Sequence, residues 1–280
     1  MNSAMVALEK KGYHRITEPL KSVAINNLFA RSVVEGHVSG TVYVDSADGP
    51  KTYHVVHPYG MSLLFGESGN GSFNSAFRDY ALNVNGVREG HEWLQAYPAA
   101  WDAVLRELFA GQTVSSAEKE GRAARGVIEL NTRVNFIFDP DRYPRAWRNG
   151  IPDDVTIAPT GRKTFAEMPG SVVPRFFWDS VDDFLARGAG FSLFYRDKLA
   201  ATAYASFVLD HFLELGIETV EEFRGRGFGL YACCALIDHC LERGLEPVWA
   251  CRLENTASYK LALKLGFEPA AKIPYYRLSN

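Results

Sequence analysis

The sequence predicts an α/β fold of the mixed (α+β) type, and three observations carry this prediction. Segments whose apolar residues recur with the helical period alternate with short runs typical of strands. Of the 280 residues, 47% are hydrophobic and 22% are charged, so the chain can bury a sizeable core and is not mainly disordered. Its length suits two domains or one large one.

The N-terminal part is predicted as a mixed α/β lobe. A helix is expected over residues 18–36, where apolar side chains recur with the helical period. Strands are expected at 38–44, 53–56 and 61–65, and further helices at 73–82 and 99–109. The small, polar and charged segment 112–126 is the best boundary, which predicts lobes over residues 1–124 and 125–280.

The second lobe alternates more clearly. Strands are expected at 155–158, 191–195, 199–209, 211–220, 246–252 and 267–278, and helices at 176–187, 227–243 and 256–265. Asn255 is a suitable N-cap for the last of these helices, and Gly266 a suitable stop.

The most informative feature is a glycine-rich turn between the strand at 211–220 and the long helix after it. Its residues are Arg224, Gly225, Arg226, Gly227, Phe228 and Gly229. Backbone N–H groups of such a turn, together with the positive end of the helix dipole, form a site suited to a pyrophosphate. The turn lacks the Gly-Lys-Ser/Thr of a P-loop, and its spacing differs from a dinucleotide fingerprint.

At these residues the sequence resembles the GNAT family of acyl-CoA N-acyltransferases. Arg224, Gly227 and Gly229 match the family's Arg/Gln-x-x-Gly-x-Gly/Ala signature, and the segments 255–258 and 264–267 match a second motif at the expected spacing. Weaker similarity at 27–35, 40–45 and 190–192 points to a two-lobed subgroup that includes a zwittermicin-resistance acetyltransferase. The resemblance implies a GNAT fold over residues 125–280.

The resemblance also implies acetyl-CoA as the acyl donor. The backbone of Ile217 and Thr219 would bond the pantetheine arm and the acyl carbonyl, and their N–H groups would stabilise a tetrahedral intermediate. Asn255 would contact the arm, with Ser258 beside it. The amides that would hold the pyrophosphate belong to Arg224, Gly225, Arg226, Gly227 and Gly229.

Two carboxylates are candidates for the base that must deprotonate the attacking amine. Glu214 and Glu218 lie four residues apart on one predicted strand and so share a face, whereas Leu215, Ile217 and Thr219 share the other. Many relatives carry a tyrosine acid where this chain has Ala262. Tyr259, about one helical turn earlier, is the candidate substitute, although a thiol leaves tolerably without an acid.

Other features argue against further partners. The formal net charge of −3 is unlike that of a nucleic-acid-binding protein, no segment is long enough to span a membrane, and no signal peptide is recognised. Three of the four cysteines cluster in one predicted helix, which favours a reducing cytoplasm. His54 and His57 lack a third ligand, so no metal site is predicted.

The sequence therefore predicts an acetyltransferase that acts on a small amine, antibiotic-like or derived from an amino acid, with the N-terminal lobe on the acceptor side. Three alternatives stay open: transfer that involves a carrier-bound donor or a protein amine, a non-catalytic acyl-CoA-binding module, and a protein that keeps only the fold. The oligomeric state is also open. Whether the N-terminal lobe is a degenerate copy of the second is undecided, because the segment 66–71 is interpreted as a loop before a capped helix.

Overall fold

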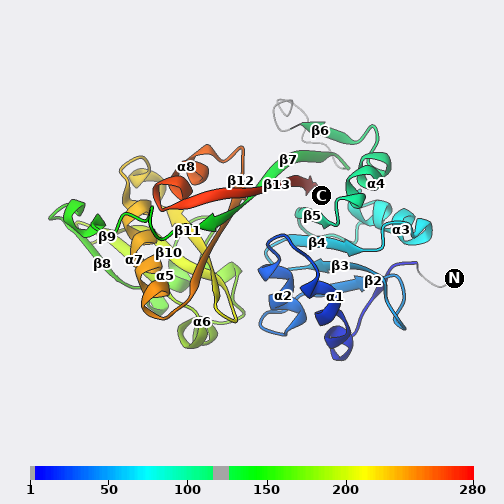
Figure 1. The fold of residues 1–280 in the computed structure, drawn as a ribbon, viewed down its shortest axis with the longest axis horizontal. Coiled ribbons are helices and arrows are strands. Elements are labelled where there is room, and N and C mark those ends of the chain that lie inside the picture. Colours follow the sequence, from blue (N-terminus) through cyan, green and yellow to red (C-terminus); the bar gives the residue numbers. More distant parts are fainter. Residues whose placement is uncertain (1–3, 116–125) are drawn as a thin grey trace. The chain divides into compact units, whose positions relative to one another are not determined.

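The computed structural model describes residues 4–115 and 126–280 (Figure 1). Its internal contacts divide the chain into two compact units. Unit 1 holds the chain up to Val134 together with Arg252–Glu254 and Ala271–Asn280. Unit 2 holds Asn135–Cys251 and Asn255–Ala270.

This division differs from a single boundary along the chain. The predicted boundary between residues 124 and 125 lies outside the described residues. The contacts change from unit 1 to unit 2 at Val134, inside the strand β7 (Ile128–Phe138), and again inside β13 (Phe267–Leu278). Because each of these strands contributes to both units, a composition shift in a linker could not reveal the division.

Unit 1 begins with short elements that lead into an antiparallel meander. Its own elements are β1 (Val6–Ala7), a 3-10 helix (Lys10–Ile16), α1 (Thr17–Lys21), α2 (Leu28–Val34), β2 (Thr41–Val44), β3 (Thr52–Val56), β4 (Met61–Gly66), α3 (Gly71–Ala81), β5 (Glu92–Tyr97), α4 (Ala100–Leu108) and β6 (Thr113–Ser115). The strands lie in the order β1-β2-β3-β4-β5-β13, and β6 pairs with β7.

Unit 2 contains the glycine-rich turn. Its elements are a 3-10 turn (Trp147–Gly150), β8 (Val155–Pro159), α5 (Arg162–Glu167), a second 3-10 turn (Pro174–Phe176), α6 (Val181–Arg187), β9 (Gly190–Tyr195), β10 (Lys198–Leu209), β11 (Phe212–Thr219), a third 3-10 turn (Glu221–Phe223), α7 (Phe228–Glu242), β12 (Glu246–Arg252) and α8 (Thr256–Lys264). The strands lie in the order β7-β12-β11-β10-β9-β8.

The two units repeat one arrangement of elements. Each has a strand, two helices, three antiparallel strands, a helix, a strand parallel to the third, and a final helix. β4, α3 and β5 thus correspond to β11, α7 and β12. The segment 66–71 occupies in unit 1 the place that the glycine-rich turn occupies in unit 2, so unit 1 is a structural copy of unit 2.

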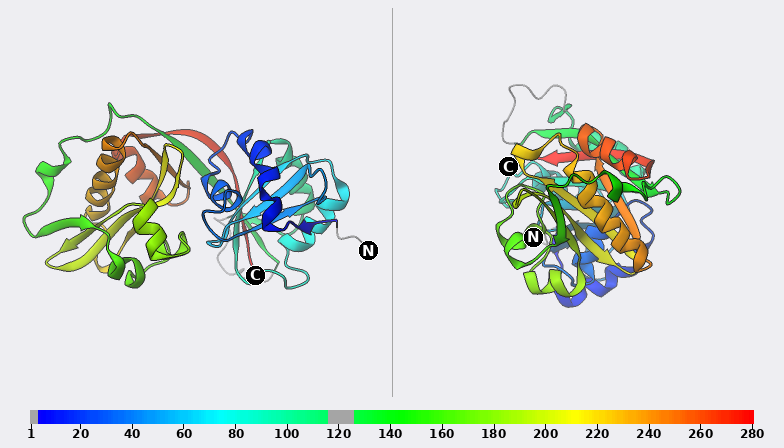
Figure 2. Two further views of the ribbon diagram at one scale, coloured as in Figure 1. Left: turned by 90° about the horizontal axis from the view of Figure 1, so that it is seen from below. Right: turned by 90° about the vertical axis from the view of Figure 1, so that its left-hand side faces the viewer.

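Helices lie on both faces of the sheet within each unit (Figure 2). In unit 2, α7 packs across β9, β10 and β11. In unit 1, α3 and α4 cover a fully apolar cluster to which β4, β5, β7 and β13 contribute. Four aromatic side chains of this cluster are fully buried: Phe73, Phe77, Trp101 and Phe109.

Two predicted helices have different bounds in the structure, and local hydrogen bonds account for both differences. The helix predicted over residues 18–36 is in fact α1 and α2, because α1 ends at the C-cap Ser22, whose N–H donates to the carbonyl of Pro19 at 3.2 Å, and α2 begins only at Leu28. The helix predicted at 176–187 begins only at Val181, because Ser180 is its N-cap and accepts from the N–H of Asp183 at 3.1 Å.

Candidate functional site

The parallel strands β11 and β12 separate after a short shared ladder. They pair at Phe212, Leu213 and Glu214, opposite Glu246, Pro247 and Val248. β11 then continues to Thr219 and β12 to Arg252. Backbone groups of β11 that face β12 beyond Glu214 therefore need another partner, such as the amides of an extended ligand.

Side chains on the free part of β11 alternate between two faces. A Cβ on Gly229 of α7 would lie 3.2 Å from Thr219 Oγ1 and 3.7 Å from Ile217 Cγ1, so these side chains point toward α7. A Cβ on Gly170 would lie 2.5 Å from Glu218 Cγ, so Glu218 points to the other face. Glu214 is on the face of Glu218 by alternation and is 5% exposed.

The glycine-rich turn leaves the first turn of α7 open. Gly227 is the N-cap of this 15-residue helix and contributes no side-chain hydrogen bond. Gly225 and Gly227 have φ angles of +80° and +81°, which glycine adopts without strain. A Cβ at either position would meet nothing within 4 Å. The N–H groups at this helix end are thus accessible to an anion.

A cavity of about 370 Å³ joins the end of β11, this turn and α8. Eight of the predicted donor-binding residues line it: Ile217, Thr219, Arg224, Gly225, Gly227, Gly229, Asn255 and Ser258. Lys260 and Lys264 also line it, and both are exposed. Their i, i+4 spacing on the helix opened by Asn255 was a signal for two cations on one face, and sequence analysis missed it.

Asn255 already has one defined role in this cavity. Its Oδ1 accepts the N–H of Ser258 at 3.2 Å, so it is the N-cap of α8. This bond uses the carbonyl oxygen of the side chain, which makes the cap compatible with a ligand contact through the amide nitrogen.

Glu218 is held by hydrogen bonds at both carboxylate oxygens. Oε2 accepts from the backbone N–H groups of Ser171 and Val172, each at 3.1 Å. Oε1 accepts from Nη2 of Arg224 at 3.3 Å. Between Glu218 and Glu214, the face is covered by Tyr204, whose ring would lie 2.5 Å from a Cβ on Gly216. The two carboxylates share a face but are separated there.

Four predicted site residues lie outside the lining of the cavity: Glu214, Glu218, Arg226 and Tyr259. Tyr259 is half-buried, and its ring packs edge-on against Phe136 with the centroids 5.4 Å apart. The guanidinium of Arg226 stacks over the ring of Tyr195 at 5.1 Å. Ala262, at the position of the family's tyrosine, is completely buried.

The corresponding turn of unit 1 is filled by its own side chains. The N-cap of α3 is Asn70, whose Oδ1 accepts the N–H of Phe73 at 3.2 Å. The amide of Asn70 donates to Asp45, which places a carboxylate where unit 2 is open. The strands β4 and β5 also stay paired from Met61 to Phe65. Unit 1 therefore lacks both the open turn and the gap between the strands.

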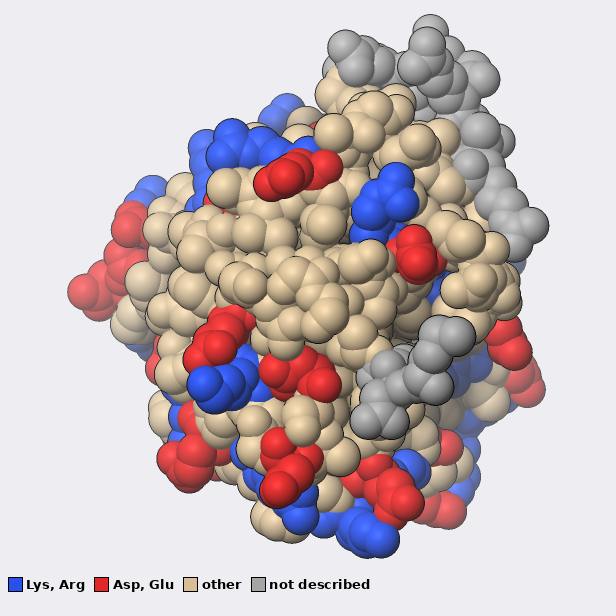
Figure 3. Space-filling model, turned by 90° about the vertical axis from the view of Figure 1, so that its right-hand side faces the viewer, with Lys and Arg blue, Asp and Glu red and all other residues tan. Residues whose placement is uncertain are grey.

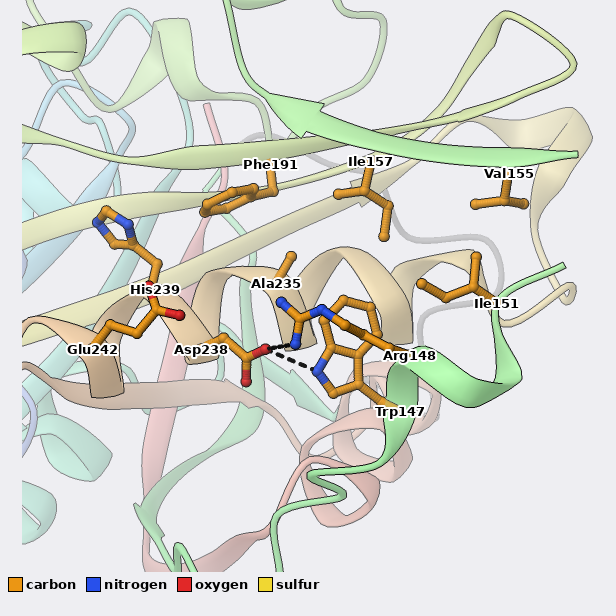
Figure 4. Close-up of a pocket in the computed structure, with 10 residues that line it drawn as sticks. All are labelled: Trp147, Arg148, Ile151, Val155, Ile157, Phe191, Ala235, Asp238, His239 and Glu242. Atoms are coloured by element: carbon orange, nitrogen blue, oxygen red, sulfur yellow. Dashed lines mark hydrogen bonds and ion pairs between the residues drawn. The ribbon is translucent and has the colours of Figure 1, made fainter. Parts of the chain in front are cut away.

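A second cavity, of about 340 Å³, lies along the C-terminal half of α7 (Figure 4). Ile157 and Phe191 form one wall, and Ala235 of α7 faces them. In its lining, the carboxylate of Asp238 on α7 accepts hydrogen bonds from Trp147 Nε1 at 3.1 Å and from Arg148. These two bonds anchor the 3-10 turn Trp147–Gly150 to α7. None of the predicted site residues lines this cavity.

Other expectations concern the remaining surface and the histidines. On the face shown in Figure 3, positive and negative side chains are interspersed. Across residues 4–115 and 126–280, no helix is long and apolar enough to cross a bilayer. Within the same residues, no group of three or more His, Cys, Asp or Glu side chains is placed to hold a metal ion. His54 is fully buried and lies 3.5 Å from the carboxylate of Glu92.

Comparison with known proteins covers nearly the whole chain. A family model described as GNAT acetyltransferase matches residues 19–276. The Bacillus subtilis protein described as the uncharacterized N-acetyltransferase YdfB is 23% identical over 251 residues, which is 89% of each chain.

Solved structures show the same fold. A GCN5-related N-acetyltransferase-like protein from Streptococcus suis superposes with a TM-score of 0.69 at 18% identity, over 95% of this chain and 98% of its own. A tandem GNAT protein from the clavulanic acid biosynthesis pathway superposes with a TM-score of 0.62 at 11% identity, over 98% of both chains. The second description agrees with the repeated arrangement of elements seen in units 1 and 2.

Proposed function

Because the chain belongs to the GNAT acetyltransferase family, we propose that it transfers the acetyl group of acetyl-CoA to the amine of a small molecule. The observation that carries this proposal is the gap between β11 and β12, which opens at Glu214 beside a turn with no side-chain cap. An extended arm fits a strand that has lost its neighbour, and a pyrophosphate fits an open helix N-terminus.

The charges around the cavity support a phosphate-bearing donor. Arg224, Lys260 and Lys264 line it together with the turn. Hydrogen bonds from such cationic side chains to anionic phosphate oxygens are stronger than those between neutral groups. The fit is specific to unit 2, since the turn of unit 1 presents Asp45 and a capped helix.

In the proposed reaction, the amine nitrogen attacks the thioester carbonyl, the carbon–sulfur bond breaks and the CoA thiolate leaves. The amine would approach on the face opposite α7, and Glu214 would accept its proton directly or through water. Glu214 suits this role because it is 5% exposed and lies at the last paired residue of the ladder. The thiolate can leave without an acid, given an ordinary thiol pKa of about 8.5.

We also propose that the protein works in the cytoplasm. All four cysteines are free and buried, and adjacent free thiols such as Cys233 and Cys234 suit a reducing compartment.

Carboxylates on the acceptor face favour a cationic amine. A screen of amino acids, aminoglycoside-like amines and peptides, read by CoA release, compares small acceptors with protein ones.

The test of the donor site is calorimetric titration of the protein with acetyl-CoA, beside a Gly227→Glu variant. The added carboxylate would stand at the helix N-terminus, so binding should be lost while the fold is kept. If wild-type protein binds no acetyl-CoA, the donor assignment is wrong. If both proteins bind equally, the donor lies elsewhere in the chain.

A further inference from the structure

One side chain of unit 2 contacts both the donor turn and a segment on the opposite face of the sheet. Glu218 accepts from Arg224 at one carboxylate oxygen and from the backbone of Ser171 and Val172 at the other. The hydrogen bonds join residues that are 47, 46 and 6 positions from Glu218 in the sequence. Only the fold brings them together.

The contact depends on a glycine at the segment. Gly170 has a φ of +129°, which side chains rarely adopt, and its Cβ would lie 2.6 Å from Glu218 Oε2. Any other residue would push the carboxylate away from the N–H groups of Ser171 and Val172. The lack of a side chain at Gly170 therefore allows the carboxylate of Glu218 to come close enough to form these hydrogen bonds.

The segment 168–176 alternates between buried and exposed parts. Met168 and Val173 are fully buried, whereas residues 169–171 between them are exposed and Phe176 at the end is 43% exposed. The guanidinium of Arg175 lies over the ring of Phe176 at 4.8 Å. The segment lies on the face of the sheet opposite α7, which is the face from which the amine would approach in the proposed reaction.

Arg224 is the part of the contact that a donor would meet. It lines the cavity, and its side chain is 60% exposed, against 10% for Glu218. Its Nε also donates to the carbonyl of Thr219 at 3.2 Å, so the guanidinium is oriented at the end of β11. A phosphate bound by Arg224 would compete with Glu218 for the guanidinium or reorient it, and would thereby shift the carboxylate of Glu218.

We propose that Glu218 is a positioning residue that couples occupancy of the donor cavity to the order of the segment 168–176. This inference rests on the proposed function, since acetyl-CoA is the ligand that would fill the cavity. A positioning role suits Glu218 because the three hydrogen bonds that it accepts hold both of its carboxylate oxygens toward Arg224 and the segment. Coupling between two sites is reciprocal, so the segment should respond to the donor.

The test is amide hydrogen exchange of the segment 168–176, measured by mass spectrometry with and without saturating acetyl-CoA. The proteins are wild type, Glu218→Ala, Glu218→Gln and the control Glu222→Gln, which removes a like charge from an exposed position four residues away. Acetyl-CoA should slow exchange of the segment at least threefold in wild type and in the control. In Glu218→Ala, exchange should be at least tenfold faster and should not respond to acetyl-CoA.

The conservative variant separates positioning from proton transfer. The amide oxygen of Gln can still accept from Ser171 and Val172, so Glu218→Gln should keep exchange within threefold of wild type. With an acceptor found by the amine screen, it should also keep the wild-type pH profile and kcat within fivefold. A base would instead lose about a hundredfold or more.

The inference is overturned by unchanged exchange of the segment in Glu218→Ala, by no response to acetyl-CoA in wild type that binds it, or by a hundredfold loss of kcat in Glu218→Gln. Faster exchange of α7 in Glu218→Ala would show general unfolding and would also count against a local role. If wild type binds no acetyl-CoA, the proposed function fails, and the loss of the coupling partner overturns this inference with it. Exchange of the segment in ligand-free wild type and Glu218→Ala would then show only whether Glu218 orders the segment, and not whether the donor does.

Discussion

Glu214 and Val248 form the last pair of the parallel ladder between β11 and β12, whereas the corresponding ladder of unit 1 continues to the pair of Phe65 and Tyr97. A strand that keeps its neighbour has no free backbone groups for an extended ligand. The two units therefore differ at the place where we propose that the donor binds.

The first prediction follows from this difference: each chain binds one acetyl-CoA. Unit 1 has paired strands and an occupied turn, so it offers no second site. Calorimetric titration should give a stoichiometry of one per chain. A stoichiometry of two would mean that the ladder between β4 and β5 opens in solution.

The second prediction exchanges the N-cap residues of the two units. Gly227→Asn should weaken acetyl-CoA binding at least tenfold, because its side chain would occupy the open space at the start of α7, where Gly227 lines the cavity. Asn tolerates the left-handed backbone of position 227, so thermal stability should be unchanged. The reverse variant, Asn70→Gly, should leave acetyl-CoA binding as it is and cost only a few tenths of a kcal/mol of stability.

The measurements are calorimetry for binding and thermal unfolding for stability. Equal donor affinity in Gly227→Asn and wild type would show that the open helix end does not hold the donor.

The third prediction compares the two remaining candidates for proton transfer. Glu214→Gln should lower kcat about a hundredfold or more at neutral pH while acetyl-CoA affinity stays within threefold. Tyr259→Phe should change kcat less than twofold, because the ring of Tyr259 packs edge-on against Phe136. Rates of CoA release with an identified amine measure both. A larger loss in Tyr259→Phe than in Glu214→Gln would assign the chemistry to the tyrosine.

Much of unit 2 could be predicted because its signals are local. The apolar period of α7 and the caps Asn255 and Gly266 lie within the elements they define. The proposed donor residues come from one turn and its neighbouring strand, so their motif is local as well.

The strand β7 was missed although its sequence carries a strand signal. Apolar Ile128, Leu130, Val134 and Phe136 alternate there with polar residues, as in a half-buried strand. What the sequence could not show is that the polar face, with Glu129 and Arg133, is buried as well. The copy in unit 1 was hidden because its turn carries a capping asparagine in place of the open glycine.

The partners of Glu218 lay beyond sequence reasoning altogether. They include the backbone N–H groups of Ser171 and Val172, which every residue except proline possesses. Only the fold shows that they converge on one carboxylate.

The fourth prediction concerns Arg88, which ties the C-terminal end of β13 to unit 1. Its side chain is 6% exposed and donates to five backbone carbonyls. Two of these, on Leu278 and Ser279, lie at the end of the chain at 3.2 Å and 2.6 Å. Burial lowers the pKa of Arg88, which nonetheless stays charged near neutral pH.

Arg88→Lys should lower the free energy of unfolding by about 2–4 kcal/mol, because a lysine cannot supply a planar fork and leaves buried carbonyls without donors. Urea denaturation measures the change. The control is Arg145→Lys, an exposed arginine with a backbone contact of 3.3 Å, which should change stability by about 0.5 kcal/mol or less. Equal effects of the two substitutions would show that the end of β13 needs no such anchor.

The fifth prediction concerns the thiols of α7. Burial raises the pKa of Cys234 and of Cys240 to about 12, and it also raises the pKa of Cys233. At pH 8 only on the order of one in ten thousand of the thiols with a pKa near 12 is ionised in the folded protein. Since the thiolate is the nucleophile, iodoacetamide should label these three positions at least a hundredfold more slowly than in urea-unfolded chain.

The sign of the pH dependence follows from the same shifts. A raised pKa means that the folded state holds its thiol protons to higher pH than the unfolded chain does. The stabilisation is complete below the unfolded pKa, near 8.5, and is lost as pH rises toward 12. Unfolding followed by urea between pH 7 and 10.5 should therefore show constant stability up to about pH 8 and a decline above it. Replacing Cys240 with Ala should make that decline less steep, whereas an unaltered slope would mean that this thiol ionises equally in both states.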